Sequence, residues 1–203
     1  MMHDSMRRTV RGPAAIALLV LLALVALAGA TACSRRETPR PTTAAAAAPA
    51  PAETFSVYEL PARWRDQSGV VRELEGFRGS PVLLAMVYTH CTATCPLAVA
   101  ELKRIAARHR DVRLVLVSLD PERDDPARLA GYARGLGLDT TRWTLLTGAD
   151  ADVRELAATL GVRYRRVTPE DLAHSNLITL LDREGRIVRQ GSGRMDDAAI
   201  AAL

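Results

Sequence analysis

The stretch that most constrains the fold runs from Val82 to Leu102 and reads VLLAMVYTHCTATCPLAVAEL. Its first part, Val82–Tyr88, is an apolar run with the length and composition of a buried strand. The part after Pro96 is rich in alanine and leucine and is typical of a helix, whose first turn tolerates proline well. Two cysteines, Cys91 and Cys95, therefore lie where a buried strand leads into a helix.

The spacing of the two cysteines limits what they can do. In a C-x-x-x-C sequence the sulfurs are about one helical turn apart, so they can face the same side. Such a pair can chelate one soft metal ion or close a disulfide. The positive end of the helix dipole favours the thiolate form, which binds metal and attacks disulfides. A plain stapling disulfide, or two buried thiols, is the alternative, although neither requires a strand–helix junction.

Residues 1–32 are typical of an export signal. A basic start, Met1–Arg11, precedes a nearly unbroken apolar run, Pro13–Ala32. Small residues before Cys33 resemble the box of bacterial lipoproteins, in which this cysteine carries the lipid, although Ala30 replaces the usual larger aliphatic residue. An uncleaved anchor is the alternative, because the run approaches the roughly 20 residues that span a bilayer. Both readings tether the rest to the exported side of the bacterial cell membrane, periplasmic or extracellular.

Residues 33–54 form a linker rich in proline and alanine, which we expect to be extended or disordered. The folded domain is then residues 55–203. The chain has three cysteines, so assigning Cys33 to the anchor leaves Cys91 and Cys95 alone in an oxidising compartment. We expect that pair to oxidise unless it is kept reduced or occupied by metal.

The charge of the chain argues against a nucleic-acid partner. There are 27 Lys and Arg against 23 Asp and Glu, and much of that excess lies in residues 1–32. The remainder shows no basic stripe with interleaved aromatic residues, which is the usual pattern of nucleic-acid binding.

The hydrophobic pattern after residue 54 predicts a mixed sheet with flanking helices. The predicted strands are two short ones between Phe55 and Leu74 around the turn Asp66–Gly69, then Val82–Tyr88, Val112–Leu119, Trp143–Thr147, Leu177–Leu181 and Arg186–Gln190. The predicted helices run from Pro96 to about His109, with Leu97, Leu102, Ile105 and Ala106 facing inward, and over Pro126–Gly135, Asp150–Leu160 and Asp196–Leu203. This order, with a cysteine pair after the first long strand, predicts an α/β thioredoxin-like fold with an N-terminal β-hairpin.

Several motifs in register resemble the SCO/SenC family of copper-binding proteins. They are Tyr88-Thr-His-Cys91 with Cys95-Pro96, the acidic loop Val117–Asp124, the strand Trp143–Gly148, and the segment from His174-Ser175 to Asp182-Arg-Glu-Gly185. The resemblance covers roughly residues 55–190. It implies copper as the bound metal, with Cys91, Cys95 and His174 as its ligands.

The chemistry of these side chains agrees with copper. Thiolates favour Cu(I), and imidazole suits Cu(I) and Cu(II), so this set can hold copper in either state. Structural zinc usually has four protein ligands, and only three candidates are evident here. His90 is a rival ligand or a neighbour of the ligands, and His109 is expected to be a solvated residue at a helix end.

The acidic loop adds two candidates. Asp120 follows a central strand at its C-terminal end, the edge where α/β proteins place their sites. It could support His174 or Cys91, or it could simply cap the turn, with Asp124 as the helix cap before Pro126. Arg123 could contact an acidic partner, but simple exposure is the plainer interpretation.

The sequence supports two functions of different classes. The first is a membrane-tethered copper chaperone without turnover. By resemblance its client is a cuproprotein such as cytochrome c oxidase subunit II with its CuA centre, and it would need a copper donor and a thiol reductant. The second is a thiol–disulfide oxidoreductase in which Cys91 attacks and Cys95 resolves. The usual thioredoxin spacing is one residue shorter, which favours metal. A peroxidase-like thiol enzyme is a third alternative, for which the sequence has no peroxide-activating motif.

Overall fold

The computed structural model of the protein describes residues 55–91 and 95–203. The predicted signal segment, the predicted linker and the lipidation candidate Cys33 all lie outside these residues. Among the helices of the described residues, none combines the length and the apolar character that crossing a membrane requires.

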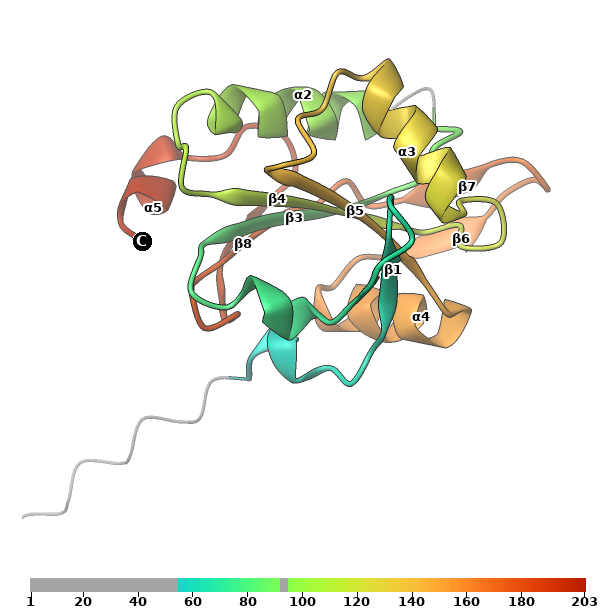
Figure 1. The fold of residues 1–203 in the computed structure, drawn as a ribbon, viewed down its shortest axis with the longest axis horizontal. Coiled ribbons are helices and arrows are strands. Elements are labelled where there is room, and N and C mark those ends of the chain that lie inside the picture. The colour runs from blue at the N-terminus through green and yellow to red at the C-terminus, as the bar shows by residue number, and fades with distance from the viewer. Residues whose placement is uncertain (1–54, 92–94) are drawn as a thin grey trace, which may run out of the picture. The chain divides into compact units, whose positions relative to one another are not determined.

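A seven-stranded mixed sheet forms the centre of the domain, in the order β2-β1-β5-β4-β3-β8-β9 (Figure 1). The strands are β1 Trp64–Asp66, β2 Val71–Arg72, β3 Val82–Val87, β4 Arg113–Ser118, β5 Trp143–Gly148, β8 Ile178–Leu181 and β9 Ile187–Gly191. Strands β3, β4 and β5 run parallel, whereas β1 on β5 and β8 on β3 are antiparallel. The prediction of an α/β fold with a mixed sheet and an N-terminal hairpin, β1–β2, is confirmed.

Helices cover both faces of this sheet. They are α2 Cys95–Ala106, α3 Pro126–Gly135, α4 Asp150–Thr159 and α5 Asp197–Ala201, with two 3-10 turns at Val57–Glu59 and Leu74–Phe77. Figure 1 shows α2 and α3 on one face and α4 on the other. All six residues of β3 are buried, as are all of β4 except Arg113. Continuous apolar strands of this kind fit only the middle of a sheet that is covered on both sides.

Helix α2 corrects two predictions. It ends at Ala106 rather than near His109, and Leu97 is 67% exposed instead of facing inward. The helix begins at the buried Cys95, so its inner face follows at intervals of three and four residues. That face consists of Cys95, Ala98, Val99, Leu102, Ile105 and Ala106. Leu97, two residues after Cys95, points away from this face.

A separate sheet of two strands, β6 Tyr164–Arg166 and β7 Leu172–His174, was not predicted. The two strands pair antiparallel, with Tyr164 opposite His174. Their sequences, YRR and LAH, are too short to show the alternation that identifies a strand. His174 therefore ends a strand, whereas none of the predicted strands or helices included it.

Candidate metal centre

Cys91 lies within the β3–α2 connection, and Cys95 begins α2. After Tyr88 the chain turns, and the Cys91 N–H donates to the Tyr88 carbonyl at 3.2 Å. Cys91 is 8% exposed, and Cys95, the first residue of α2, is 0% exposed. The Cys95 N–H donates to the Cys91 Sγ at 3.3 Å. A backbone donor of helix α2 thus points at the Cys91 sulfur, as expected for a thiol beside a helix start.

His174 reaches the same place from a different part of the chain. Its Nε2 lies 3.4 Å from the Cys95 Sγ, and its Nδ1 lies 3.1 Å from the carbonyl oxygen of Ser175. A carbonyl only accepts, so this contact puts the ring proton on Nδ1 and leaves the Nε2 lone pair directed at the sulfurs. Metal-binding histidines are commonly oriented by such a bond. The ring also packs against Tyr88 in a T-shaped arrangement, with ring centroids 5.7 Å apart.

The three side chains converge on one point. One ligand atom each from Cys91, Cys95 and His174 lies within 4.8 Å of the other two. Two atoms bonded to one metal at about 2.0–2.3 Å each are at most roughly 4.6 Å apart. Three atoms bonded to the same ion are closer still, at most roughly 4 Å apart when they surround it evenly, so side-chain movements of about 1 Å or less bring all three within bonding distance, and the residues present fit a soft metal ion.

Burial changes the expected state of one thiol. Burial raises the pKa of the Cys95 thiol above its ordinary value, and its hydrogen bond with the Cys91 side chain raises that pKa further. The expectation that a helix start favours the thiolate is therefore wrong for Cys95. A metal ion binding there displaces the thiol proton, as metal binding to cysteine generally does.

His90 lies beside the site but outside this group of three ligands. Its Nε2 accepts from the Arg128 guanidinium at 2.6 Å, and its Nδ1 lies 3.4 Å from the Thr89 hydroxyl. Both ring nitrogens are thus engaged, which supports the interpretation of His90 as a neighbour rather than a ligand. His109 is not solvated as expected: its side chain is largely buried, 3.7 Å from Asp197.

Asp124 has a different role from the predicted helix cap. It is completely buried and accepts from the Thr89 N–H at 3.0 Å, the Thr89 hydroxyl at 2.5 Å and the Ser118 hydroxyl at 2.6 Å. The cap of α3 is Asp125, which accepts from the Arg128 N–H. Asp124 therefore fixes the turn that leads to the cysteines, because Thr89 stands two residues before Cys91.

Asp120 is also completely buried, and it forms ion pairs with two arginines. Its Oδ2 accepts from Arg123 at 2.7 Å, and its Oδ1 accepts from Arg166 at 3.0 Å. Arg123 is therefore an internal partner of Asp120 rather than a simply exposed residue. The described contacts of Asp120 join it to β6, so any support of His174 passes through the β6–β7 hairpin.

Tyr88 is a site residue whose role the sequence did not indicate. Its hydroxyl donates to the Asp171 carboxylate and accepts from the Leu172 N–H at 3.4 Å, and its ring packs on His174. The Asp171 bond and burial raise the pKa of the Tyr88 phenol, with burial the larger cause. Tyr88 belongs to the first motif as Tyr88-Thr-His-Cys91, but its partner is 83 residues away and no local pattern identifies it.

Two surface hollows differ in their relation to the site. One of about 310 Å³ borders His174 and is lined by Arg163 and Arg165. The larger one, of about 530 Å³, is lined by the β2 region from Val71 to Phe77 and contains none of the candidate ligands. The larger hollow is therefore not the one beside the candidate ligands, and only the smaller of these two borders His174.

The chain belongs to the SCO1/SenC family, whose model matches residues 53–203. Among curated proteins it is 28% identical over 144 residues to the SCO1 protein homolog of Bacillus subtilis, covering 67% of this chain and 75% of that one. It is 30% identical over 132 residues to the mitochondrial SCO2 homolog of Mus musculus, covering 59% and 50%.

Solved structures show the same fold. The structure of Bradyrhizobium japonicum ScoI with copper bound is 29% identical, with a TM-score of 0.58, covering 70% of this chain and 94% of that one. BsSco, described as a member of the Sco family of cytochrome c oxidase assembly proteins, is 24% identical with a TM-score of 0.62, covering 74% and 92%. The predicted thioredoxin-like fold and the family resemblance are both confirmed.

Proposed function

We propose that this protein is a copper chaperone tethered to the exported face of the bacterial cell membrane. It binds one copper ion through Cys91, Cys95 and His174 and delivers it to a cuproprotein, the CuA centre of cytochrome c oxidase subunit II. The observation that carries the proposal is the convergence of two sulfurs and an imidazole nitrogen within 4.8 Å. Membership of a family with a copper-bound solved structure supports it.

The ligand set suits capture and release. Two thiolates give affinity for Cu(I), and imidazole lets the same site accept Cu(II). Three protein ligands leave room for a ligand from an incoming protein, so copper can pass by stepwise ligand exchange. The hollow beside His174 gives that partner a side from which to approach.

The first test is the copper stoichiometry of the protein, purified reduced and without oxygen. We expect one tightly bound Cu(I) per monomer, lost in Cys91→Ala and in Cys95→Ala. His109→Ala is the matched control, because this histidine lies outside the group of ligands. Failure of the reduced protein to retain copper would contradict the proposal.

The tether is tested separately. Cys33→Ser should release the protein from the membrane fraction or mislocalise it if Cys33 carries a lipid. If the segment before it is an uncleaved anchor instead, the same variant should stay in the membrane fraction. Recovery of the unaltered protein in the soluble cytoplasmic fraction would contradict both forms of tethering.

A thiol–disulfide oxidoreductase is the second candidate, and the contact between the two cysteines favours it. The Cys95 N–H donates to the Cys91 Sγ, and Cys91 is the more exposed thiol. Cys91 would attack a client disulfide, and Cys95 would displace the client as the new disulfide closes. His174→Ala separates the two functions, because it should weaken copper binding and leave disulfide exchange intact.

A further inference from the structure

The hairpin that carries His174 is not part of the main sheet. Strands β6 and β7 pair only with each other among the described strands. No backbone ladder therefore sets the distance between this hairpin and the cysteines. Apart from its short chain connections to α4 and β8, its position depends on side chains that reach from the hairpin to the body of the domain.

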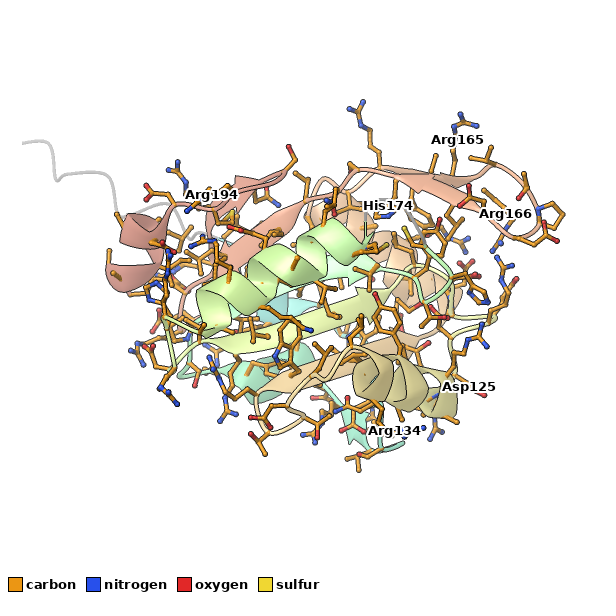
Figure 2. All side chains as sticks on the ribbon, turned by 90° about the horizontal axis from the view of Figure 1, so that it is seen from above. Asp125, Arg134, Arg165, Arg166, His174 and Arg194 are labelled. Carbon is orange, nitrogen blue, oxygen red and sulfur yellow. The ribbon has the colours of Figure 1, made fainter. Side chains whose placement is uncertain are left out.

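The inner face of the hairpin follows from its register. Arg166 pairs with Leu172 as Tyr164 pairs with His174. Because strand side chains alternate, these residues share one face, and Arg165 lies on the other. Leu172 is buried in the core and Arg165 is exposed. Figure 2 shows Arg165 directed away from the domain.

Arg166 connects this inner face to the end of β4. Its Nη2 donates to the Asp120 Oδ1 at 3.0 Å, and its Nη1 donates to the Pro169 carbonyl within the hairpin loop at 3.1 Å. Glu122 lies farther off, at 3.9 Å. One guanidinium thus ties the hairpin to itself and to the body.

The energetics favour a closed hairpin. The Asp120 side chain is 0% exposed, and the Arg166 side chain is 40% exposed. If the hairpin moved away, Arg166 would be solvated by water, but Asp120 would keep only Arg123 and one buried carboxylate oxygen would lose its partner. Leaving a buried charge incompletely paired is costly. The burial of Asp120 therefore favours the position of the hairpin in which Arg166 contacts it.

We propose that the Asp120–Arg166 ion pair is a latch that positions His174 against Cys91 and Cys95. Arg166 is a positioning residue: it touches none of the three ligands in the described contacts and acts on them through the hairpin. Tyr88 secures the other strand through Asp171 and Leu172, but it also packs on the His174 ring. Arg166 therefore gives the cleaner test. The predicted change in copper affinity rests on the proposed function, whereas the positioning of His174 by the ion pair does not.

The first measurement is the Cu(I) affinity of Arg166→Gln in the whole reduced protein, by competition with a chromophoric chelator. We expect roughly tenfold weaker binding, within the range for outer supports of a metal ligand. Arg165→Gln removes the same charge from the neighbouring residue and should bind like the wild type, and Arg166→Lys should recover part of the loss. Equal affinities of Arg166→Gln and Arg165→Gln would overturn the latch.

A double-mutant cycle separates positioning from general destabilisation. If Arg166 acts through His174, the loss caused by Arg166→Gln should disappear when His174→Ala is already present. A latch that merely stabilised the fold would give the same fold-loss in both backgrounds, and that result would overturn the proposal.

The metal-free protein gives a readout that does not depend on copper. His174 Nε2 lies 3.4 Å from the Cys95 sulfur, and we expect its displacement to expose that sulfur, so iodoacetamide should alkylate Cys95 several-fold faster in Arg166→Gln than in Arg165→Gln. Faster alkylation in a protein that binds no copper would keep the latch and refute the proposed function. Copper binding that needs His174 but not Arg166, with unchanged alkylation, would refute the latch alone.

Discussion

The cysteines and the histidine of the candidate metal centre are held by two different kinds of structure. Cys91 and Cys95 follow β3, which is hydrogen-bonded to β4 on one side and to β8 on the other. His174 belongs to a two-stranded hairpin that forms no ladder with that sheet in the described part of the chain. The cysteine side is anchored by backbone ladders and apolar burial, and the histidine side by a few side-chain contacts.

This difference in anchoring indicates which part of the site can open. Central strands open only with much of the fold, whereas segments held by few buried contacts open locally. The candidate site thus has a fixed half, made by the cysteines, and a half that can be displaced at lower cost. Under the proposed function, copper would stay on the two sulfurs while His174 yields its position to a ligand of the client.

The largest effect is expected from the fixed half. Cys95→Ser replaces a buried soft ligand with a hydroxyl, which Cu(I) does not favour. Tight Cu(I) binding should be lost, by more than about 100-fold, which exceeds the usual cost of removing an outer support. Competition with a chromophoric chelator measures the affinity, and circular dichroism checks the fold. A Cu(I) affinity of Cys95→Ser near that of the wild type would contradict the proposed difference between the two halves of the site.

A smaller loss is expected from the displaceable half. His174→Ala leaves both sulfurs, so Cu(I) affinity should fall less than in Cys95→Ser, but by at least the roughly tenfold expected when a ligand merely loses a supporting residue. The absorption spectrum of the Cu(II) form should change as well, because imidazole leaves the site. If His174→Ala were as damaging as Cys95→Ser, the two halves would not differ in the way that their anchoring suggests.

The anchoring of the fixed half can be measured as stability. Asp124→Asn disturbs three hydrogen bonds of a buried carboxylate and should lower the free energy of unfolding by about 2–4 kcal/mol. Asp125→Ala removes the neighbouring exposed helix cap and should cost only about 1 kcal/mol. Urea denaturation compares the two variants. Equal costs would show that the buried network does not hold the turn before Cys91.

Much of the fixed half was predictable, because its signals are local. The apolar run Val82–Tyr88, the C-x-x-x-C spacing and Pro96 together predicted a strand, a turn and a helix, and the structure has them in that order. The error at Leu97 came from assigning the wrong side of the helix to the core, that is, from the rotational phase of the helix. The phase depends on Cys95 being buried, and the sequence does not show that burial.

The displaceable half was predictable only in part. The family resemblance identified His174, but neither strand of its hairpin was expected. Its supports join residues far apart in the chain: Asp120 and Arg166 are separated by 46 positions, and Tyr88 and Asp171 by 83. Charged residues such as Arg165 and Arg166 look alike in sequence, and only the register of the hairpin shows which one faces Asp120.

The smallest effect is expected at α5, which belongs to neither half. The Arg104 and Arg108 guanidiniums lower the pKa of Asp197 to about 2. Because this folded-state pKa lies below the ordinary value of 3.8, the pairing stabilises the fold above about pH 4 and is lost as the pH falls toward 2. Asp197→Asn should therefore lower the unfolding midpoint slightly at pH 5, and its difference from the wild type should vanish near pH 2.

Asp197→Asn also serves as a remote control for the comparison. The Asp197 side chain is 36% exposed, so solvent screens its ion pairs and their loss should leave Cu(I) affinity at neutral pH unchanged. Arg166→Gln breaks an ion pair with a completely buried partner beside the histidine hairpin and should weaken that affinity. If both variants weakened copper binding equally, the metal site would respond to any lost ion pair, and the contrast between the two halves would not explain the effect of Arg166.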